Sequence, residues 1–268
     1  SVQFLDSNYN GGCGSNAACC GGWLDNLAGF YQVKKMIVPW SNANAHYQDG
    51  SRSCGGCSAV PTYRISASPN YRVSSIATSR IATQGLPSEQ AIANIKGVLL
   101  QGKAIWFGFF LPDASSWSNF QDFWGGKPEA AIWQPDYACG RTYSYQSGGG
   151  HAVLCLGYND TDPKNRYWIM LNSWGTTKAR PDGLFMVSMD MNYSCNYTGL
   201  GYAYYWMTLD AQFERAALPE VAEEGSGGLR SAAQIRAEAE RKAQEAKEEL
   251  EEARDDIDSK REERRAAK

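Results

Sequence analysis

Every aromatic residue of this 268-residue chain lies at or before Phe213. The part up to this residue carries nine Trp, fifteen Tyr and nine Phe, in short runs that Gly, Ser and Pro interrupt. Beyond it, charged residues and Ala dominate. Because a folded core needs large apolar side chains, this division predicts a globular region at residues 1–213 and a non-globular extension after it.

The extension divides again by composition. Residues 214–228 are rich in Glu and Gly and contain a Pro, which is typical of a flexible linker. Residues 229–268 lack Gly and Pro and consist of strong helix formers, so they predict one long helix. Its apolar residues recur at spacings of three and four, as in the seam of a heptad repeat: Ala239, Ala243, Ala246, Leu250, Ala253 and Ile257.

Two interpretations of this helix remain open. One is a solvated single helix, held by Glu-to-Lys and Glu-to-Arg pairs four residues apart. The other is a helix that docks on a partner protein or on a second copy, in a homo-oligomer or a filament. We favour the partner helix, because a helix with so little apolar surface gains more by docking than by standing alone.

Charge and hydropathy exclude several classes of partner. The formal charge of −3 gives no field that would attract nucleic acid or an anionic membrane surface. No apolar run approaches the roughly 18 residues that a membrane span needs, and residues 1–12 show no basic region followed by an apolar stretch. We therefore expect a soluble protein with no nucleic-acid partner, no membrane span and no cofactor.

Eight cysteines are many for a cytosolic protein, and an even number suits a disulfide framework. They are Cys13, Cys19, Cys20, Cys54, Cys57, Cys139, Cys155 and Cys195. Three glycosylation sequons, at Asn159, Asn192 and Asn196, favour the same secretory compartment. The sequence thus predicts a secreted glycoprotein.

A zinc site is the alternative use of these cysteines. Cys54 and Cys57 form one Cys-x-x-Cys pair, but the sequence holds no second pair. Only His46 and His151 are left to complete such a site. We therefore favour disulfides and expect no metal site.

Hydrophobic periodicity predicts helices first and strands afterwards. A helix at 16–36 would place Trp23, Leu27, Phe30 and Tyr31 on one face, although its glycine pair weakens the pattern. A helix at 88–102 would begin with Ser88 as N-cap and bury Ala91, Ile92, Ile95, Val98 and Leu99. Short β-like runs occupy 104–111, 150–158, 166–175, 183–189 and 201–209. This order predicts an α+β fold with two layers, helical over about 1–100 and β-rich over about 101–213.

Four motifs appear in a familiar order along the globular region. They are "NGGCGSN" at 10–16, "SCGGC" at 53–57, "GGGHAVLCLGY" at 148–158 and "YWIMLNSWG" at 167–175. With them, residues 5–213 resemble the papain-like (C1 family) cysteine peptidases, in which "SCGGC" looks like the Cys-x-Gly-Gly segment that lines the substrate cleft. The resemblance implies a two-layer fold with a helical left domain and a β-barrel-like right domain, to which the C-terminal helix is added.

The resemblance also implies roles for individual residues. Cysteine peptidase chemistry needs a thiolate, an imidazole that takes its proton and a group that orients the imidazole. His151 would be the base, Asn172 the orienting amide and Trp174 a cover over their hydrogen bond. Disulfides would join Cys13 to Cys54 and Cys139 to Cys195.

The nucleophilic cysteine is the one part of this chemistry that the resemblance does not supply. Carried over residue by residue, its position falls on Asn16, the following tryptophan on Ala17 and the oxyanion-hole glutamine on Asn10. An amide cannot be deprotonated to a useful nucleophile near neutral pH. We therefore expect a catalytically inactive pseudo-peptidase, secreted and acting as a structural or interaction subunit through its helix and its aromatic surface.

Two alternatives stay open. In the first, the chain is an active cysteine endopeptidase whose nucleophile has moved to Cys20 or Cys19; otherwise one of these is a core residue and the other pairs with Cys57. In the second, the many aromatic side chains serve a module that binds peptide or glycan. Cys155, on the interior of the histidine strand, is expected to be a buried free thiol.

Overall fold

The computed structural model describes residues 1–9, 21–49 and 60–214. The chain divides into two compact units, Ser1–Arg215 and Ala216–Lys268, and the described residues all lie in the first. The linker beyond Glu214 and the long helix fall outside the described residues, as do the motifs at 10–16 and 53–57. The predicted site residues among the undescribed ones are Asn10, Cys13, Asn16, Ala17, Cys19, Cys20, Cys54 and Cys57.

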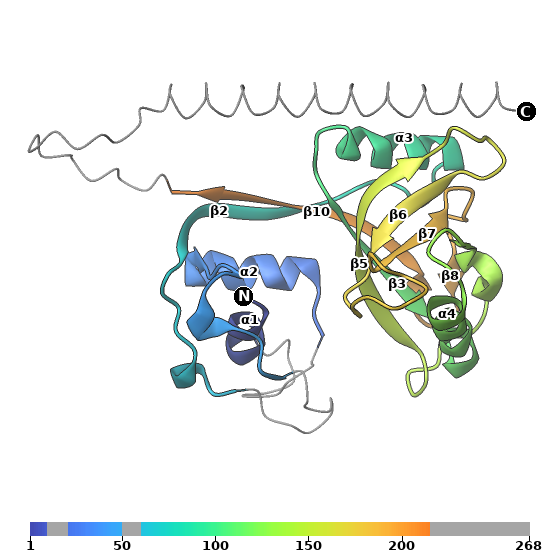
Figure 1. Ribbon diagram of the computed structural model, residues 1–268. Helices are drawn as coiled ribbons and strands as arrows, with labels where there is room; N and C mark the ends of the chain where they lie inside the picture. The colour runs from blue at the N-terminus through green and yellow to red at the C-terminus, as the bar shows by residue number, and fades with distance from the viewer. Residues whose placement is uncertain (10–20, 50–59, 215–268) are drawn as a thin grey trace, which may run out of the picture. The chain divides into compact units, whose positions relative to one another are not determined.

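The fold is α+β, as predicted, and its centre is one large sheet. Eight strands lie in the order β1-β2-β10-β3-β5-β6-β7-β4, and β8 pairs with β9 in a second, small sheet (Figure 1). Neighbouring strands are antiparallel, except that β4 and β7 are parallel. The strands are β1 Met36–Ile37, β2 Tyr71–Arg80, β3 Ile105–Leu111, β4 Ile132–Trp133, β5 Gly149–Asn159, β6 Tyr167–Leu171, β7 Leu184–Ser188, β8 Asn196–Tyr197, β9 Gly201–Tyr202 and β10 Tyr204–Phe213.

The helices of the described part gather in two places. In Figure 1, α1 and α2 lie together, whereas α3 and α4 lie beside β3, β5, β6 and β7. The α-helices are α1 Val2–Asn8, α2 Leu24–Lys34, α3 Ser88–Leu99 and α4 Ala114–Gly126, and short 3-10 helices occupy Ala43–Ala45, Thr62–Arg64 and Pro135–Ala138. None of these helices is long and apolar enough to cross a membrane.

Two hydrophobic cores hold these groups, and the ribbon of β2 and β10 connects them. Ile76 of β2 belongs to the core around α1 and α2, and Ala211 of β10, its partner in register, packs against the same core. Trp206, nearer the start of β10, belongs to the larger core of the β-rich half. Strand β10 therefore contributes residues to both cores and connects the helical half with the β-rich half.

The larger core explains the sequence of β3. Alternate residues of this strand, Ile105, Phe107, Phe109 and Leu111, are buried in the core. The other face carries Trp106, Gly108 and Phe110, which lie toward a cavity described below. The aromatic residues on one face of β3 thus build the core, and those on the other face line the cavity.

The strand predictions are confirmed, with ends shifted by a few residues. Both predicted helices are too long. Gly21, Gly22 and Trp23 are not helical, because Gly21 adopts a φ of 64° and Trp23 is the extended N-cap residue of α2. Helix α3 begins at Ser88, so Pro87 and not Ser88 is its N-cap, and it ends at Leu99.

Several elements were not anticipated, among them α1, β2 and α4. Helix α1 is short, and β2 has an exposed, Ser-rich sequence in which only Val73 and Ile76 are buried. Helix α4 carries bulky aromatic residues and ends in two glycines, a composition that hides its helical period. The predicted helical half therefore also contains strands, and the predicted β-rich half contains helices.

Candidate functional site

Three successive glycines bring the chain into β5 just before His151. A Cβ on Gly148 would lie 2.7 Å from the carbonyl oxygens of both Pro112 and Ser144. A Cβ on Gly150 would lie 2.9 Å from the ring of Phe110 on the neighbouring strand. Only glycine fits these approaches without displacement, so the sequence Gly-Gly-Gly-His fixes the position of His151 on the sheet.

The imidazole of His151 is oriented by Asn172, which follows β6. Its Nε2 lies 2.8 Å from Oδ1 of Asn172, and the backbone N–H of Ser173 donates to the same oxygen at 2.8 Å. A backbone N–H can only donate, so the amide oxygen and not the nitrogen occupies this point. The Nε2 atom must then carry the proton of a neutral imidazole, which leaves the Nδ1 lone pair available as a base.

Aromatic rings surround this pair. The Trp174 ring lies at a centroid distance of 4.7 Å from His151, with the planes inclined by 30°. Phe109, Trp117 and Phe120 complete the surroundings at 5.5, 6.5 and 6.2 Å. Burial lowers the pKa of His151 below its ordinary value of 6.5, and the hydrogen bond to Asn172 opposes this only in part. His151 is therefore a neutral base near pH 7.

His151 opens onto a cavity of about 430 Å³ between the two halves of the described unit. Small residues flank His151 in this cavity, and aromatic residues and glycines form the rest of the wall. The lining comprises Gly21, Gly22, Trp23, Trp106, Gly108, Phe109, Phe110, Gly150, His151, Ala152 and Ser173. Small residues beside a base leave room for an extended segment to approach it, and the aromatic side chains offer apolar contact.

The glycines opposite His151 belong to the sequence "CCGG" at 19–22. The resemblance equates "SCGGC" at 53–57, which lies outside the described residues, with the Cys-x-Gly-Gly segment, but there the two glycines directly follow Cys54. The Cys-x-Gly-Gly spacing itself occurs at Cys19-Cys20-Gly21-Gly22, and these two glycines line the His151 cavity. This spacing is the signal in the sequence that points to residues 19–22.

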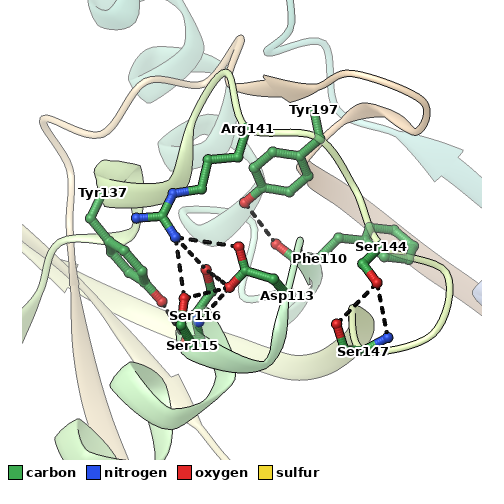
Figure 2. A network of polar contacts seen from close by, with 9 residues as sticks. All are labelled: Phe110, Asp113, Ser115, Ser116, Tyr137, Arg141, Ser144, Ser147 and Tyr197. Atoms are coloured by element: carbon green, nitrogen blue, oxygen red, sulfur yellow. Dashed lines mark hydrogen bonds and ion pairs between the residues drawn. The ribbon is translucent and has the colours of Figure 1, made fainter.

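A polar network holds the first turn of α4, which supplies Trp117 and Phe120 to the site (Figure 2). Asp113 caps the helix by accepting from the backbone N–H of Ser116 at 2.8 Å, and Arg141 pairs with it at 3.3 Å. Hydrogen bonds, that of Ser115 foremost, lower the pKa of Asp113 to about 2. The hydroxyl of Tyr137 donates to the carbonyl of Ser116 at 2.7 Å.

The cysteines of the described residues offer no nucleophile. The predicted disulfide between Cys139 and Cys195 is confirmed. Cys155 is a buried free thiol, as predicted. Burial raises its pKa to about 12, so it stays protonated and unreactive at neutral pH.

The remaining predicted sites can be placed only in part. The sequon residues Asn192 and Asn196 are exposed, and Asn159 is half-buried. Within 1–9, 21–49 and 60–214, no group of three His, Cys, Asp or Glu side chains could hold a metal ion.

Comparisons with known proteins place one part of the chain in a known family model. The model of the papain family cysteine proteases matches residues 129–204. Bromelain from Ananas comosus in complex with the E64 inhibitor is 20% identical, with 79% of this chain and 76% of that chain covered and a TM-score of 0.43. Xylellain from Xylella fastidiosa is 21% identical, with 78% and 69% covered and a TM-score of 0.44.

SERA5E from Plasmodium falciparum is 15% identical, with 78% of this chain and 76% of that chain covered and a TM-score of 0.46. No curated protein sequence matches the chain. Residues 129–204, which carry His151, Asn172 and Trp174, are thus the part of the chain that is similar to papain family cysteine proteases.

Proposed function

We propose that the chain is a papain-like pseudo-peptidase, whose cleft binds extended peptide segments and does not hydrolyse them. One observation carries this proposal: the His151 and Asn172 pair is set as a base at the cavity, but no reactive thiol accompanies it among the described residues. Binding needs only the cavity wall, whereas hydrolysis needs a thiolate beside Nδ1.

The position of Asn16 is a weaker support than the sequence suggested. The resemblance aligns Asn16 with a nucleophile at the start of a helix, but α2 begins only at Leu24. What remains of that argument is the chemistry of the amide, which cannot act as a nucleophile wherever Asn16 lies.

An active cysteine peptidase is the second candidate, and one observation favours it. Gly21, which lines the His151 cavity, directly follows Cys19 and Cys20 in the sequence. A thiolate from either residue would complete the chemistry if it reached Nδ1 of His151, with the thiol proton passing to the imidazole.

Labelling with a thiol-reactive peptidyl epoxide distinguishes the two candidates. We expect no covalent labelling and no peptide cleavage by the full chain, together with reversible binding of peptides that Trp23→Ala weakens. Labelling that both His151→Ala and Cys20→Ala, or His151→Ala and Cys19→Ala, abolish would establish the active peptidase. Cys155→Ala is the matched control, because this thiol is buried and protonated.

Secretion is part of the proposal, and the Cys139–Cys195 disulfide supports it. We propose that Asn192 and Asn196, both exposed, carry glycans, and that Asn159 is modified less completely because it is half-buried. Expression through a eukaryotic secretory pathway, followed by enzymatic deglycosylation and mass measurement, tests each site. An unmodified protein in the medium would refute the glycan assignment.

The partner is proposed to dock on the helix at 229–268. A chain cut after residue 213 should then remain folded and monomeric, whereas the full chain should assemble with itself or with its partner. The mass of both forms in solution, measured by light scattering, tests this, and equal assembly of the two would show that the helix is not needed.

A further inference from the structure

Arg180 is fully buried, and the three hydrogen bonds of its guanidinium all go to backbone carbonyls. Nε donates to the carbonyl of Trp124 at 2.8 Å, Nη2 to that of Phe123 at 3.0 Å and Nη1 to that of Leu184 at 2.9 Å. A buried guanidinium is costly unless its donors are satisfied, so these three bonds define its place closely.

The carbonyls of Phe123 and Trp124 belong to the last turn of α4, which ends at Gly126. A helix carries partial negative charge at this end, and a cation is favourable there. Arg180 therefore closes the C-terminal end of α4 and ties it to the start of β7 through Leu184.

A row of planar groups leads from Arg180 to the imidazole of His151. The guanidinium lies over the Trp124 ring at 4.9 Å, and Trp124 meets Trp174 at 5.7 Å with the rings nearly perpendicular, at 89°. Trp174 in turn lies over His151 at 4.7 Å. Trp124 is 7% exposed but Trp174 is 42% exposed, so Trp174 depends on its inner neighbours for its position.

We propose that Arg180 is a positioning residue for the His151 site, which it serves by fixing Trp124 so that Trp174 stays over the His151–Asn172 pair. Whether this positioning matters for peptide binding or catalysis rests on the proposed function. The positioning itself can be measured through the pKa and the NMR signal of His151, whether or not the protein binds or cleaves peptides.

Among residues 1–9, 21–49 and 60–214, the side chains that contact the His151 ring are uncharged on each element that supplies them. They are Phe109 from β3, Trp117 and Phe120 from α4, and Asn172 and Trp174 after β6. Of the charged residues nearest to these along the chain, Asp113 pairs with Arg141, and Asp122 and Lys178 are exposed to solvent. Loss of cover over His151 would therefore change mainly its access to water.

The test is a pH titration of the full chain, in which NMR of isotope-labelled histidine measures the pKa of His151. Only two histidines occur, so His46→Gln assigns the His151 signal, and His46 in the other samples serves as the reference. In Arg180→Met, water reaches the imidazole and its pKa should rise towards 6.5, with loss of the ring-current shift from Trp174. Arg180→Lys keeps the charge but cannot span three carbonyls, and should give a smaller rise.

Arg166→Met is the matched control, because the Arg166 guanidinium pairs with Glu89 and Asp190, and none of these residues contacts the rings around His151. It should leave the His151 titration unchanged. An unchanged titration in folded Arg180→Met, or an equal rise in Arg166→Met, would overturn the proposal. If Arg180→Met does not fold, Trp124→Leu removes the intermediate ring alone; it should give the same rise, and no rise would count against the inference.

Discussion

Oδ1 of Asn172 accepts two hydrogen bonds, one of them from Nε2 of His151 at 2.8 Å. The other end of this amide, Nδ2, is buried and has no hydrogen-bond partner among the described residues. Leaving a buried donor unpaired costs about 1–3 kcal/mol. Asn172 is therefore placed for its oxygen, which sets the tautomer of His151, and this is the arrangement that a base needs.

Stability should depend on pH through His151. Its folded pKa lies below 6.5, so the unfolded chain binds the proton more strongly and stability falls as the pH drops from above 6.5 to the folded pKa. Thermal unfolding from pH 7.5 to pH 5 measures this. His151→Gln should flatten the curve in this window, and an unchanged curve would contradict the burial of the imidazole.

The Cys139–Cys195 disulfide should contribute strongly to stability. It links residues separated by 56 positions. Restricting the unfolded chain by a loop of this size is worth about 4 kcal/mol in the chain-entropy model. Denaturant unfolding of Cys139→Ser/Cys195→Ser against the unmodified protein measures the difference. A loss below about 1 kcal/mol would show that the bridge restricts the unfolded chain far less than its length suggests.

Cys155 should resist alkylation as long as the protein is folded. Its thiol is buried, and its pKa of about 12 leaves almost no thiolate at pH 8. Iodoacetamide should label the peptide that contains Cys155 only after denaturation. Mass spectrometry of that peptide makes the readout independent of the other cysteines, and labelling in the native state would show that the core around β5 opens.

The site residues that the structure describes come mainly from the β-rich half, and the sequence identifies them through two short motifs. The base strand and the Asn-Ser-Trp-Gly strand carry their roles in short contiguous motifs, so His151, Asn172 and Trp174 could be named together. That His151 and Asn172 lie next to each other nevertheless followed from the resemblance alone. They are 21 positions apart in the sequence, and the pairing of β5 with β6 brings them together.

Hydrophobic periodicity alone misses two features of the site. "CCGG" at 19–22 reads as part of a helix, since nothing local reveals that Gly21 adopts a positive φ and turns the chain toward the cavity. Arg180 lies in a polar loop sequence, where an arginine is ordinarily exposed. Arg180 can be buried because the carbonyls at the end of α4 accept its hydrogen bonds. The sequence did not predict this helix, because its many aromatic residues hide the helical periodicity.

The approach to His151 can be tested through its glycines. A methyl group on Gly148 would meet two backbone oxygens at 2.7 Å, those of Pro112 and Ser144, and backbone cannot rotate away as a side chain can. Gly148→Ala should therefore destabilise the fold by about 1–3 kcal/mol and displace His151 from Asn172.

Gly157, on the same strand, is the matched control. A methyl group there would make only an ordinary contact of 3.8 Å with Ile169, so Gly157→Ala should change the free energy of unfolding by less than about 0.5 kcal/mol. Urea unfolding gives both energies, and the NMR shift of His151 reports its position. Equal effects of the two substitutions would mean that the turn before β5 is looser than the contacts of Gly148 require.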